Sequence, residues 1–530
     1  MNKRNYNVFF NTHTVSGIVI SIALYVIFFA GAFTLFQEEI AIWETGAPVS
    51  HQEKVAIDFD KIIKEVSESH NLLGRDIRLN FGGEADEMYV FLARSKDTIH
   101  NKNGATTTYF HLNTKDYKQS DYLEHYTLAQ FLYRLHFFSQ IPYIGSYLSG
   151  FVALFFLFAI VTGTIVHWKK MVSNFFAFNP KVLLKRVWTD AHTALGIIGL
   201  PYQFIFAVTG AYFCLSLLVL LPANILYGGD RNALLNDFRP DRALVTWESA
   251  SDKSVLSFND FAQSTCERWE GFHLQRAIIK NFGGTNMQYL LTGKLTDPTQ
   301  FSSTGWLVQD AHSGAISIGA DPFHTPYTDS VQNVMRNLHF ASFGGYLVKV
   351  LYFILALITC FVIITGVLIW IEARNKKTMT LKQRKYTVKI GHIYLASCLS
   401  MFPVTAMSFV FVKLTTGLFI HQKEVIYSFY FCMWLLFTLY FRFKRDNYFT
   451  NKYTLLVGGL FSFMIPIVNG IQSNSWLWTS YTQGHKAVFI IDFIWLVLGL
   501  LALGIYFKMH PKVKEKSSFY KNPIPQKKTV

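Results

Sequence analysis

Long apolar stretches alternate with polar segments along the 530 residues of this chain. A membrane-spanning helix needs about 20 mostly apolar residues, because the hydrocarbon core is about 30 Å thick and a helix rises about 1.5 Å per residue. We predict eight membrane helices, of which the seventh is short and contains Pro466. The predicted helices span residues 15–36, 143–166, 193–221, 346–371, 390–412, 424–440, 455–468 and 487–507.

Two polar segments, at about 40–130 and 222–330, separate the first helix from the second and the third from the fourth. In each, a stretch with helical spacing precedes three stretches rich in β-branched and aromatic residues. The helices are predicted at 59–69 and 257–269, and the strands at 77–81, 88–93, 107–112, 277–282, 287–292 and 305–310. Each polar segment is therefore predicted to be a small α+β domain inserted between two membrane helices.

The first and second thirds of the chain repeat each other. The block at 13–18 (HTVSGI) recurs at 192–197 (HTALGI), and a Gly-Ala pair starts 18 residues after each histidine. Leu-His-Phe recurs at 135–137 and 338–340, with the glycine of a Thr-Gly pair 27 residues after each histidine. We predict copy one at 1–170, copy two at 190–374, a four-helix extension at 390–510 and a basic tail at 511–530.

Composition agrees with a mainly α-helical polytopic membrane protein. Hydrophobic residues make up 51% of the chain and charged residues 16%, against about 25% charged in a soluble domain. The net charge of +15 comes from Lys and Arg gathered in the links after helices two, four and six and in the tail. Such clusters mark the cytoplasmic side, so both termini are expected there and both polar domains outside. No nucleic-acid partner is expected, because no basic face lies on a soluble domain.

Four of the 17 histidines belong to the repeat. His13 and His192 begin helices one and three at matching inner depth, and His136 and His339 begin helices two and four at matching outer depth. Polar residues at membrane depth are costly and usually functional. Two neutral imidazoles on opposite helices can clamp a porphyrin iron from both faces, which predicts an inner and an outer ligand pair. Interfacial caps preserved by duplication are the alternative.

Further candidates surround these histidines. The glycines near them either let a broad ring approach the backbone or allow close helix packing; they are Gly17, Gly31, Gly163, Gly196, Gly210 and Gly366. Arg134 and Arg336 are predicted either to pair with haem propionates or to extend to lipid headgroups. His167 and His392 also belong to the inner layer and are alternative inner ligands. The chain has no C-x-x-C-H motif, so covalent c-type haem is not expected.

Together these features resemble the PepSY-associated transmembrane family of bacterial inner-membrane proteins. The matching elements are the two His-x-x-x-Gly helix starts at His13 and His192, the Thr-Gly helix ends, and the two Leu-His-Phe entries. The polar segments resemble PepSY domains, where 110–115 and 308–314 take the place of the closing strand and turn. The resemblance covers about 1–374.

Members of this family include iron-regulated membrane proteins and haem-containing ferric-siderophore reductases. The resemblance implies two b-type haems, each with two histidine ligands, that pass electrons across the inner membrane to a periplasmic ferric chelate such as a siderophore. The family's ligands carry over to His13, His136, His192 and His339, and with less support to His167 and His392. The chain has no G-x-G-x-x-G between a strand and a helix, so a separate reductase or a quinol is expected to donate the electrons.

Two other functions are compatible with the sequence. In the first, the PepSY-like domains bind or restrain a periplasmic peptidase and no cofactor is needed, which leaves the membrane histidines unexplained. In the second, the repeat forms a transporter of iron chelates, since parallel repeats occur in transporters. The helices lack a midplane cluster of charges, however, and Pro201 and Pro403 are isolated kink candidates.

Overall fold

The computed structural model places eight helices that are long and apolar enough to cross a membrane, which confirms the prediction of a mainly helical polytopic membrane protein. The structure describes residues 1–46, 57–81, 87–101, 104, 106–121, 126–171, 173, 184–215, 220–296, 301–376 and 378–510. The helices are α1 (Lys3–Thr34), α5 (Gly145–His167), α7 (Leu184–Cys214), α13 (Gly345–Ala373), α14 (Leu381–Thr415), α15 (Gln422–Lys444), α16 (Asn447–Ser473) and α18 (Lys486–Lys508). The predicted tail at 511–530 and most of the basic link at 174–183 lie outside the described residues.

Several helix boundaries differ from the prediction: α1 begins at Lys3 instead of 15 and α14 at Leu381 instead of 390, and two further differences involve proline. The seventh membrane helix, α16, runs for 27 residues straight through Pro466, since proline is tolerated in membrane helices where neighbouring groups satisfy the freed backbone. The third was predicted to reach residue 221, but α7 ends at Cys214. A new helix, α9 (Leu221–Leu226), begins with Pro222 in its first turn, a position that proline favours. Apolar composition alone did not reveal this break.

The polar segments form the eight strands of one antiparallel sheet, with strand order β4-β3-β2-β1-β5-β6-β7-β8. The first segment supplies β1 (Ile77–Asn80), β2 (Glu87–Leu92), β3 (Thr108–Asn113) and β4 (Gln119–Asp121). The second supplies β5 (Phe272–Lys280), β6 (Gln288–Leu295), β7 (Thr304–Asp310) and β8 (Ile316–Ala320). The sequence predicted the first three strands of each half and missed the short outermost strands.

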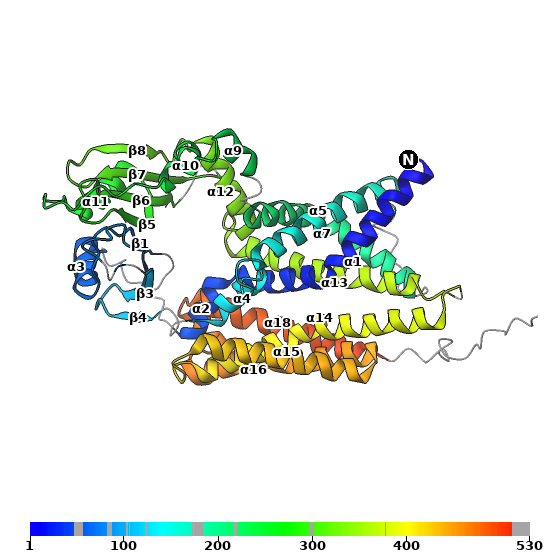
Figure 1. Ribbon diagram of the computed structural model, residues 1–530. Helices are drawn as coiled ribbons and strands as arrows, with labels where there is room; N and C mark the ends of the chain where they lie inside the picture. The colour runs from blue at the N-terminus through cyan, green and yellow to red at the C-terminus, as the bar shows by residue number, and fades with distance from the viewer. Residues whose placement is uncertain are drawn as a thin grey trace, which may run out of the picture. The chain divides into compact units, whose positions relative to one another are not determined.

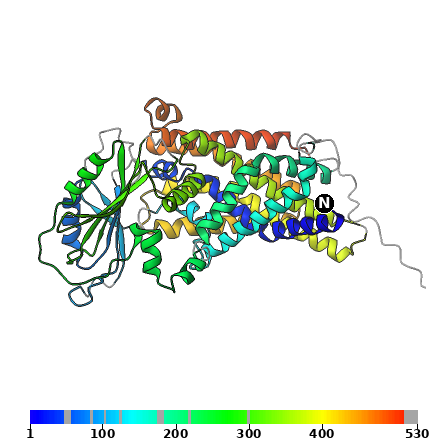
Figure 2. The ribbon, with the colours of Figure 1, turned by 90° about the horizontal axis from the view of Figure 1, so that it is seen from above.

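The two halves join edge to edge, so they are not separate domains. β1 pairs antiparallel with β5, with Ile77 opposite Ile279 and Leu79 opposite Ala277. Figure 1 and Figure 2 show these two strands side by side in the middle of the sheet. An unpaired β1 or β5 would leave a row of backbone groups without partners, and the joint satisfies both edges at once.

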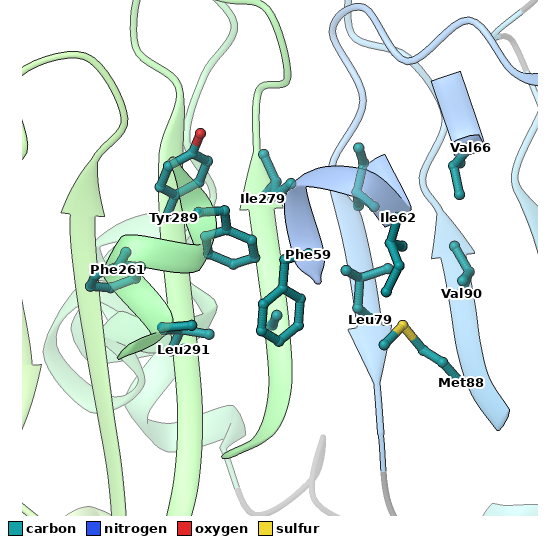
Figure 3. Packing of buried hydrophobic residues seen from close by; sticks show 14 of the residues in the cluster. Phe59, Ile62, Val66, Leu79, Met88, Val90, Phe261, Ile279, Tyr289 and Leu291 are labelled. Carbon is teal, nitrogen blue, oxygen red and sulfur yellow. The ribbon is translucent and has the colours of Figure 1, made fainter. Parts of the chain in front are cut away.

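One hydrophobic core spans both halves beneath two helices, α3 (Phe59–Ser69) and α11 (Phe258–Arg268). Figure 3 shows side chains of both helices and of the strands filling the same layer. The rings of Phe59 and Phe258 meet at the boundary, with centroids 5.2 Å apart. Alternate strand residues such as Leu79 and Ile279 point into this layer, as the period of two in a strand requires.

The two helices also cap each other at the boundary between the halves. The backbone N–H of Phe59 donates to Asn259 Oδ1 over 2.7 Å, and the N–H of Phe258 donates to Asp60 Oδ1 over 2.8 Å. Each acceptor occupies the second position of its helix, so the exchange is symmetric. Helix N-termini carry N–H groups without intrahelical partners. Here a side-chain oxygen from each copy accepts one of these N–H groups from the helix of the other copy.

The chain divides into two compact units, and the features above other than α14, α15, α16 and α18 lie in the first. The first unit comprises Met1–Trp370 and Gly417–Val425, and the second comprises Ile371–Thr416 and Ile426–Val530. In the second unit α16 packs between α14 and α18. Its interior contains Asp492, fully buried on α18, whose carboxylate accepts a hydrogen bond from Asn469 Nδ2 at 2.8 Å.

Candidate functional site: two pairs of histidines

His13 on α1 and His192 on α7 face each other, with ring centroids 6.1 Å apart and ring planes at 69°. We call them the distal pair, because they lie farther from the sheet than the second pair of histidines described below. His13 Nδ1 lies 2.8 Å from the carbonyl oxygen of Ala159, and His192 Nδ1 lies 3.0 Å from that of Val362. The sequence repeat is therefore also a structural repeat, because each histidine is hydrogen-bonded to the second membrane helix of its own copy.

The Thr-Gly pairs explain how the distal histidines reach those carbonyls. Ala159 and Val362 each precede the glycine of a Thr-Gly pair by four residues, one helical turn. A Cβ on Gly163 would lie 2.9 Å from His13 Cε1, and a Cβ on Gly366 would lie 3.2 Å from His192 Cε1. These glycines thus leave room for the imidazole itself.

His136 and His339 form a second pair, with centroids 5.9 Å apart and planes at 47°. They do not begin membrane helices as predicted, but lie at or near the ends of two short helices, α4 (Leu128–His136) and α12 (Tyr327–Phe340). Each short helix is followed by a left-handed residue, Phe138 at φ 56° and Ala341 at φ 54°. A left-handed residue ends a helix, so α5 and α13 start several residues later.

We call His136 and His339 the sheet-side pair, because α12 is hydrogen-bonded to the sheet. Trp306 Nε1 of β7 donates to Asp329 of α12 over 3.1 Å, and Asn333 Nδ2 donates to Ser302 Oγ over 2.9 Å. His136 Nδ1 lies 2.7 Å from the carbonyl oxygen of Ile27 on α1. His13 and Ile27 are 14 residues apart on α1, which places the two pairs about 21 Å apart along that helix.

Within the described residues, the four imidazoles make hydrogen bonds through Nδ1 and none through Nε2. The Nδ1 partners of three are backbone carbonyls, which only accept, so the Nδ1 atoms carry the protons. His339 Nδ1 lies 2.8 Å from Thr209 Oγ1, whose own hydrogen is donated to the carbonyl of Ile205. Each ring therefore offers a bare Nε2 lone pair, the arrangement by which proteins orient histidine ligands.

Burial favours the uncharged rings that metal binding requires. α4 and α12 lie outside the eight candidate spans, and burial lowers the pKa of both His136 and His339. The proximity of His136 lowers the pKa of His339 further. Both rings are therefore neutral at physiological pH.

The spacing of each pair fits a metal ion held between two imidazoles. Metal-to-imidazole bonds of about 2 Å on each side predict roughly 6 Å between ring centroids, and the observed values are 5.9 and 6.1 Å. Gly17 and Gly196 lie one turn after the distal histidines, and within the described structure a Cβ at either position would meet no neighbouring atom within 4 Å. Open space beside a two-histidine site fits the broad plane of a haem. In the described part of the chain, no group of three or more His, Cys, Asp or Glu could hold a metal ion.

The remaining predicted residues differ in their surroundings. A Cβ on Gly31 would lie 2.6 Å from His136 Nδ1, so this glycine admits the sheet-side ring, whereas a Cβ on Gly210 would meet the Ala153 side chain at 3.3 Å. Gly210 therefore serves helix packing. Arg134 precedes His136 by two residues on α4, and Arg336 precedes His339 by three on α12.

The two alternative inner histidines belong to different units of the chain. His167 ends α5 and lies within electrostatic range of both distal histidines. His392 lies in the second unit, where its Nδ1 is 2.7 Å from Asn447 Oδ1. The two histidines that face each other in the distal layer are His13 and His192.

Sequence reasoning missed the residues that hold the rings in place. Thr209 bonds to His339, and Thr365 Oγ1 lies 3.2 Å from His192 Nδ1. Phe206 packs against His339 with ring centroids 4.9 Å apart, and Tyr202 packs against Phe206 at 4.4 Å. Thr365 was visible as part of the repeated Thr-Gly pair, but nothing in the sequence separated Phe206 from the other 49 phenylalanines.

The fold and the paired histidines define a polytopic membrane protein built on a duplicated unit of helix, half-sheet and helix. The family model for the PepSY-associated TM region matches residues 10–373, about two thirds of the chain. The chain belongs to this family, as the motifs predicted. A comparison with curated protein sequences finds no significant match.

Proposed function

We propose that this protein is a transmembrane electron carrier that holds two b-type haems, one in each histidine pair, and reduces a ferric chelate such as a siderophore. The observation that carries this proposal is the shared geometry of the two pairs: about 6 Å between rings, every Nδ1 hydrogen-bonded, and no Nε2 hydrogen-bonded to any described residue. Interfacial caps would not need two such pairs in register.

The side chains have defined tasks in this proposal. His13, His136, His192 and His339 hold the two groups, and their Nδ1 partners fix the ring orientation and raise the basicity of Nε2. Gly17 and Gly196 leave space beside the distal pair. Arg134 and Arg336 would neutralise propionates of the haem at the sheet-side pair. Haem supplies a one-electron couple when bound.

The direction of transfer follows from charge and topology. Basic residues in the links after α5, α13 and α15 favour a cytoplasmic location for these links. We therefore place the protein in a bacterial inner membrane, with the sheet in the periplasm. A separate reductase or a quinol supplies the electrons. Ferric iron reduced at the sheet-side pair leaves its chelate, because Fe(II) binds hard oxygen ligands more weakly.

An absorption spectrum tests the proposal directly. Protein purified from haem-replete cells should show a Soret band and about two haems per chain by pyridine haemochrome, one per bis-histidine site. Mixing the reduced protein with a ferric chelate should oxidise the haem and release Fe(II), detected with a ferrous-specific dye. The matched control is the double variant His136→Ala/His339→Ala, which should lose the reaction.

The possible outcomes separate the parts of the proposal. Colourless protein would reject the haem proposal and favour a regulator of a peptidase. If the haem stays reduced in the presence of ferric chelates, the proposal of an electron carrier stands and the proposal of chelate reduction is rejected.

A further inference from the structure

The face of the sheet opposite α3 and α11 carries a row of basic residues. Arg78 of β1 lies opposite Ile278, and Asn80 lies opposite Arg276 of β5. Residues two apart in a strand share a face, so Arg78 and Arg276 both lie on the face away from the core. Lys294 of β6 is on the same face, two residues from Thr292, the cross-strand partner of Arg276.

A short helix adds more charge over this face. η3 (Pro240–Arg242) contacts β7 and is preceded by Arg239. Asp241, the acid of this segment, is already engaged, because Arg239 Nε and Nη2 donate to its two oxygens over 2.9 and 2.8 Å. Arg242 lies more loosely, with its Nε 3.9 Å from Asp241. One carboxylate is therefore shared among several arginines.

Arg276 interacts electrostatically with several of these charges. It is half-buried, and burial is the largest cause that lowers its pKa. Asp241 opposes this shift, whereas Arg336, Arg239 and Arg78 add to it. Lys294 also has its pKa lowered by burial first and by Arg336 second. A half-buried guanidinium among like charges is costly, and an anionic ligand would relieve that cost.

The basic cluster adjoins the sheet-side histidines through α12. Arg336 precedes His339 by three residues, so the two share one face of this helix with about 5–6 Å between their Cβ atoms. Tyr133 links the cluster to His136, which it precedes by three residues on α4. Burial raises the pKa of Tyr133, and the nearby positive charge of Arg336 partly offsets this rise. An anion held by the cluster would therefore lie beside the sheet-side pair.

We propose that the cluster of Arg78, Arg242, Arg276 and Lys294, beside Arg336, binds a polyanionic, carboxylate-bearing iron chelate. The planar guanidinium fork matches a carboxylate with two parallel hydrogen bonds. This inference rests on the proposed function for the fate of the iron, but not for the charge selectivity of the site. It makes an anionic chelate, rather than a neutral or cationic one, the substrate class.

Equilibrium binding of radiolabelled ferric citrate tests the site without requiring turnover. The full chain is placed in nanodiscs of phosphatidylcholine, and Arg276→Gln is compared with the unmodified protein. Loss of a charge-assisted contact should weaken binding roughly tenfold or more, and added salt should weaken it further. The neutral chelate ferric tris(acetohydroxamate) should show no such dependence on Arg276.

Two further variants guard against a trivial loss of structure. Arg268→Gln removes an arginine from the exposed end of α11, on the other side of the sheet, and should bind ferric citrate normally. Arg276→Lys keeps the charge without the fork and should recover part of the affinity. Equal loss in Arg268→Gln, or unchanged binding in Arg276→Gln, would overturn the proposal.

The remaining outcomes distinguish the two proposals and the two sources of anion. Colourless protein that binds ferric citrate through Arg276 would reject the haem function and leave the anion site intact. Haem-bearing protein that reduces ferric chelates with no dependence on Arg276 would support the haem function and reject the anion site. Loss of ferric citrate binding when phosphatidylglycerol is added to the nanodiscs would identify a lipid-headgroup site and overturn the chelate assignment.

Discussion

The distal and sheet-side pairs have nearly the same ring spacing but are supported differently. In the distal pair, His13 and His192 both belong to long membrane helices and both contact a carbonyl one turn before a glycine. In the sheet-side pair, His136 contacts a carbonyl of α1, while His339 contacts the hydroxyl of Thr209. Duplication thus kept both pairs, while only the distal pair kept the same support in both copies.

The difference follows from where each pair is attached. The distal histidines are fixed by straight helix-on-helix packing, which the duplication repeats. The sheet-side histidines sit on short helices that connect to the half-sheets, and the two half-sheets are not alike in length: β5 has nine residues and β1 has four. The surroundings of the two histidines therefore differ more between the copies in the sheet-side pair than in the distal pair. The sheet-side pair is also the one that adjoins the basic cluster.

The largest expected effect comes from removing a ligand. His339→Ala and His192→Ala should each lower the haem-to-protein ratio from about two to about one, because a bis-histidine site loses one axial ligand. Only His339→Ala should also abolish reduction of ferric chelates by chemically reduced protein. The control His392→Ala should keep both haems. A ratio unchanged in either ligand variant would show that the pairing is wrong.

A smaller loss is expected where a glycine admits a histidine. In Gly31→Ala the new Cβ would lie 2.6 Å from His136 Nδ1, so the ring must move and the sheet-side haem should bind roughly 10- to 100-fold more weakly, as for other changes around metal ligands. Haem transfer to apomyoglobin measures this. Gly504→Ala is the matched control, since its Cβ would meet nothing within 4 Å. Equal behaviour of the two variants would argue against the role of Gly31.

The distal pair offers a test of the space for the macrocycle. A Cβ on Gly17 or Gly196 would meet no other described side chain or helix within 4 Å, so Gly17→Ala and Gly196→Ala should not destabilise the haem-free protein. They should weaken binding of the distal haem by about 1 kcal/mol or more, because the methyl group would crowd the ligand. Thermal unfolding with and without haem checks both parts. A loss of stability in the haem-free protein would instead indicate helix packing.

The smallest effect concerns the hydroxyl that singles out the sheet-side pair. Thr209→Val removes the acceptor for His339 Nδ1, which makes the imidazole a weaker donor and should raise the midpoint potential of the sheet-side haem. A net hydrogen bond of about 1 kcal/mol corresponds to roughly 40 mV for one electron. Spectroelectrochemical titration measures the shift, and Thr209→Ser should restore the original value.

The copy-two threonine in the distal layer provides the comparison. Thr365→Val should shift the distal potential less, since His192 Nδ1 keeps its bond to the carbonyl of Val362. A shift of equal size in both layers would mean that the hydroxyls, and not the carbonyls, set the orientation of both rings.

Much of this molecule could be predicted from its sequence, because the governing patterns are local. Twenty apolar residues in a row specify a membrane helix through hydration energy alone, and alternation specifies a strand. The repeat of His13 at His192, and of His136 at His339, placed matching histidines at matching depth. The counterpart of each histidine in the other copy was therefore its predicted partner, and the structure brings these same histidines together in pairs.

Tertiary structure alone decided the rest, because those contacts join residues far apart in the chain. No local pattern tells β1 to pair with β5, 200 residues away, or Asn259 to cap the helix that starts at Phe59. The same holds for Thr209 under His339 and for Arg276 among Arg78, Arg239 and Arg336. The chemistry of the side chains was enough to identify the histidines as candidate ligands. Long-range packing decided which acceptor binds each Nδ1 proton, and it brought the basic residues together beside the sheet-side pair.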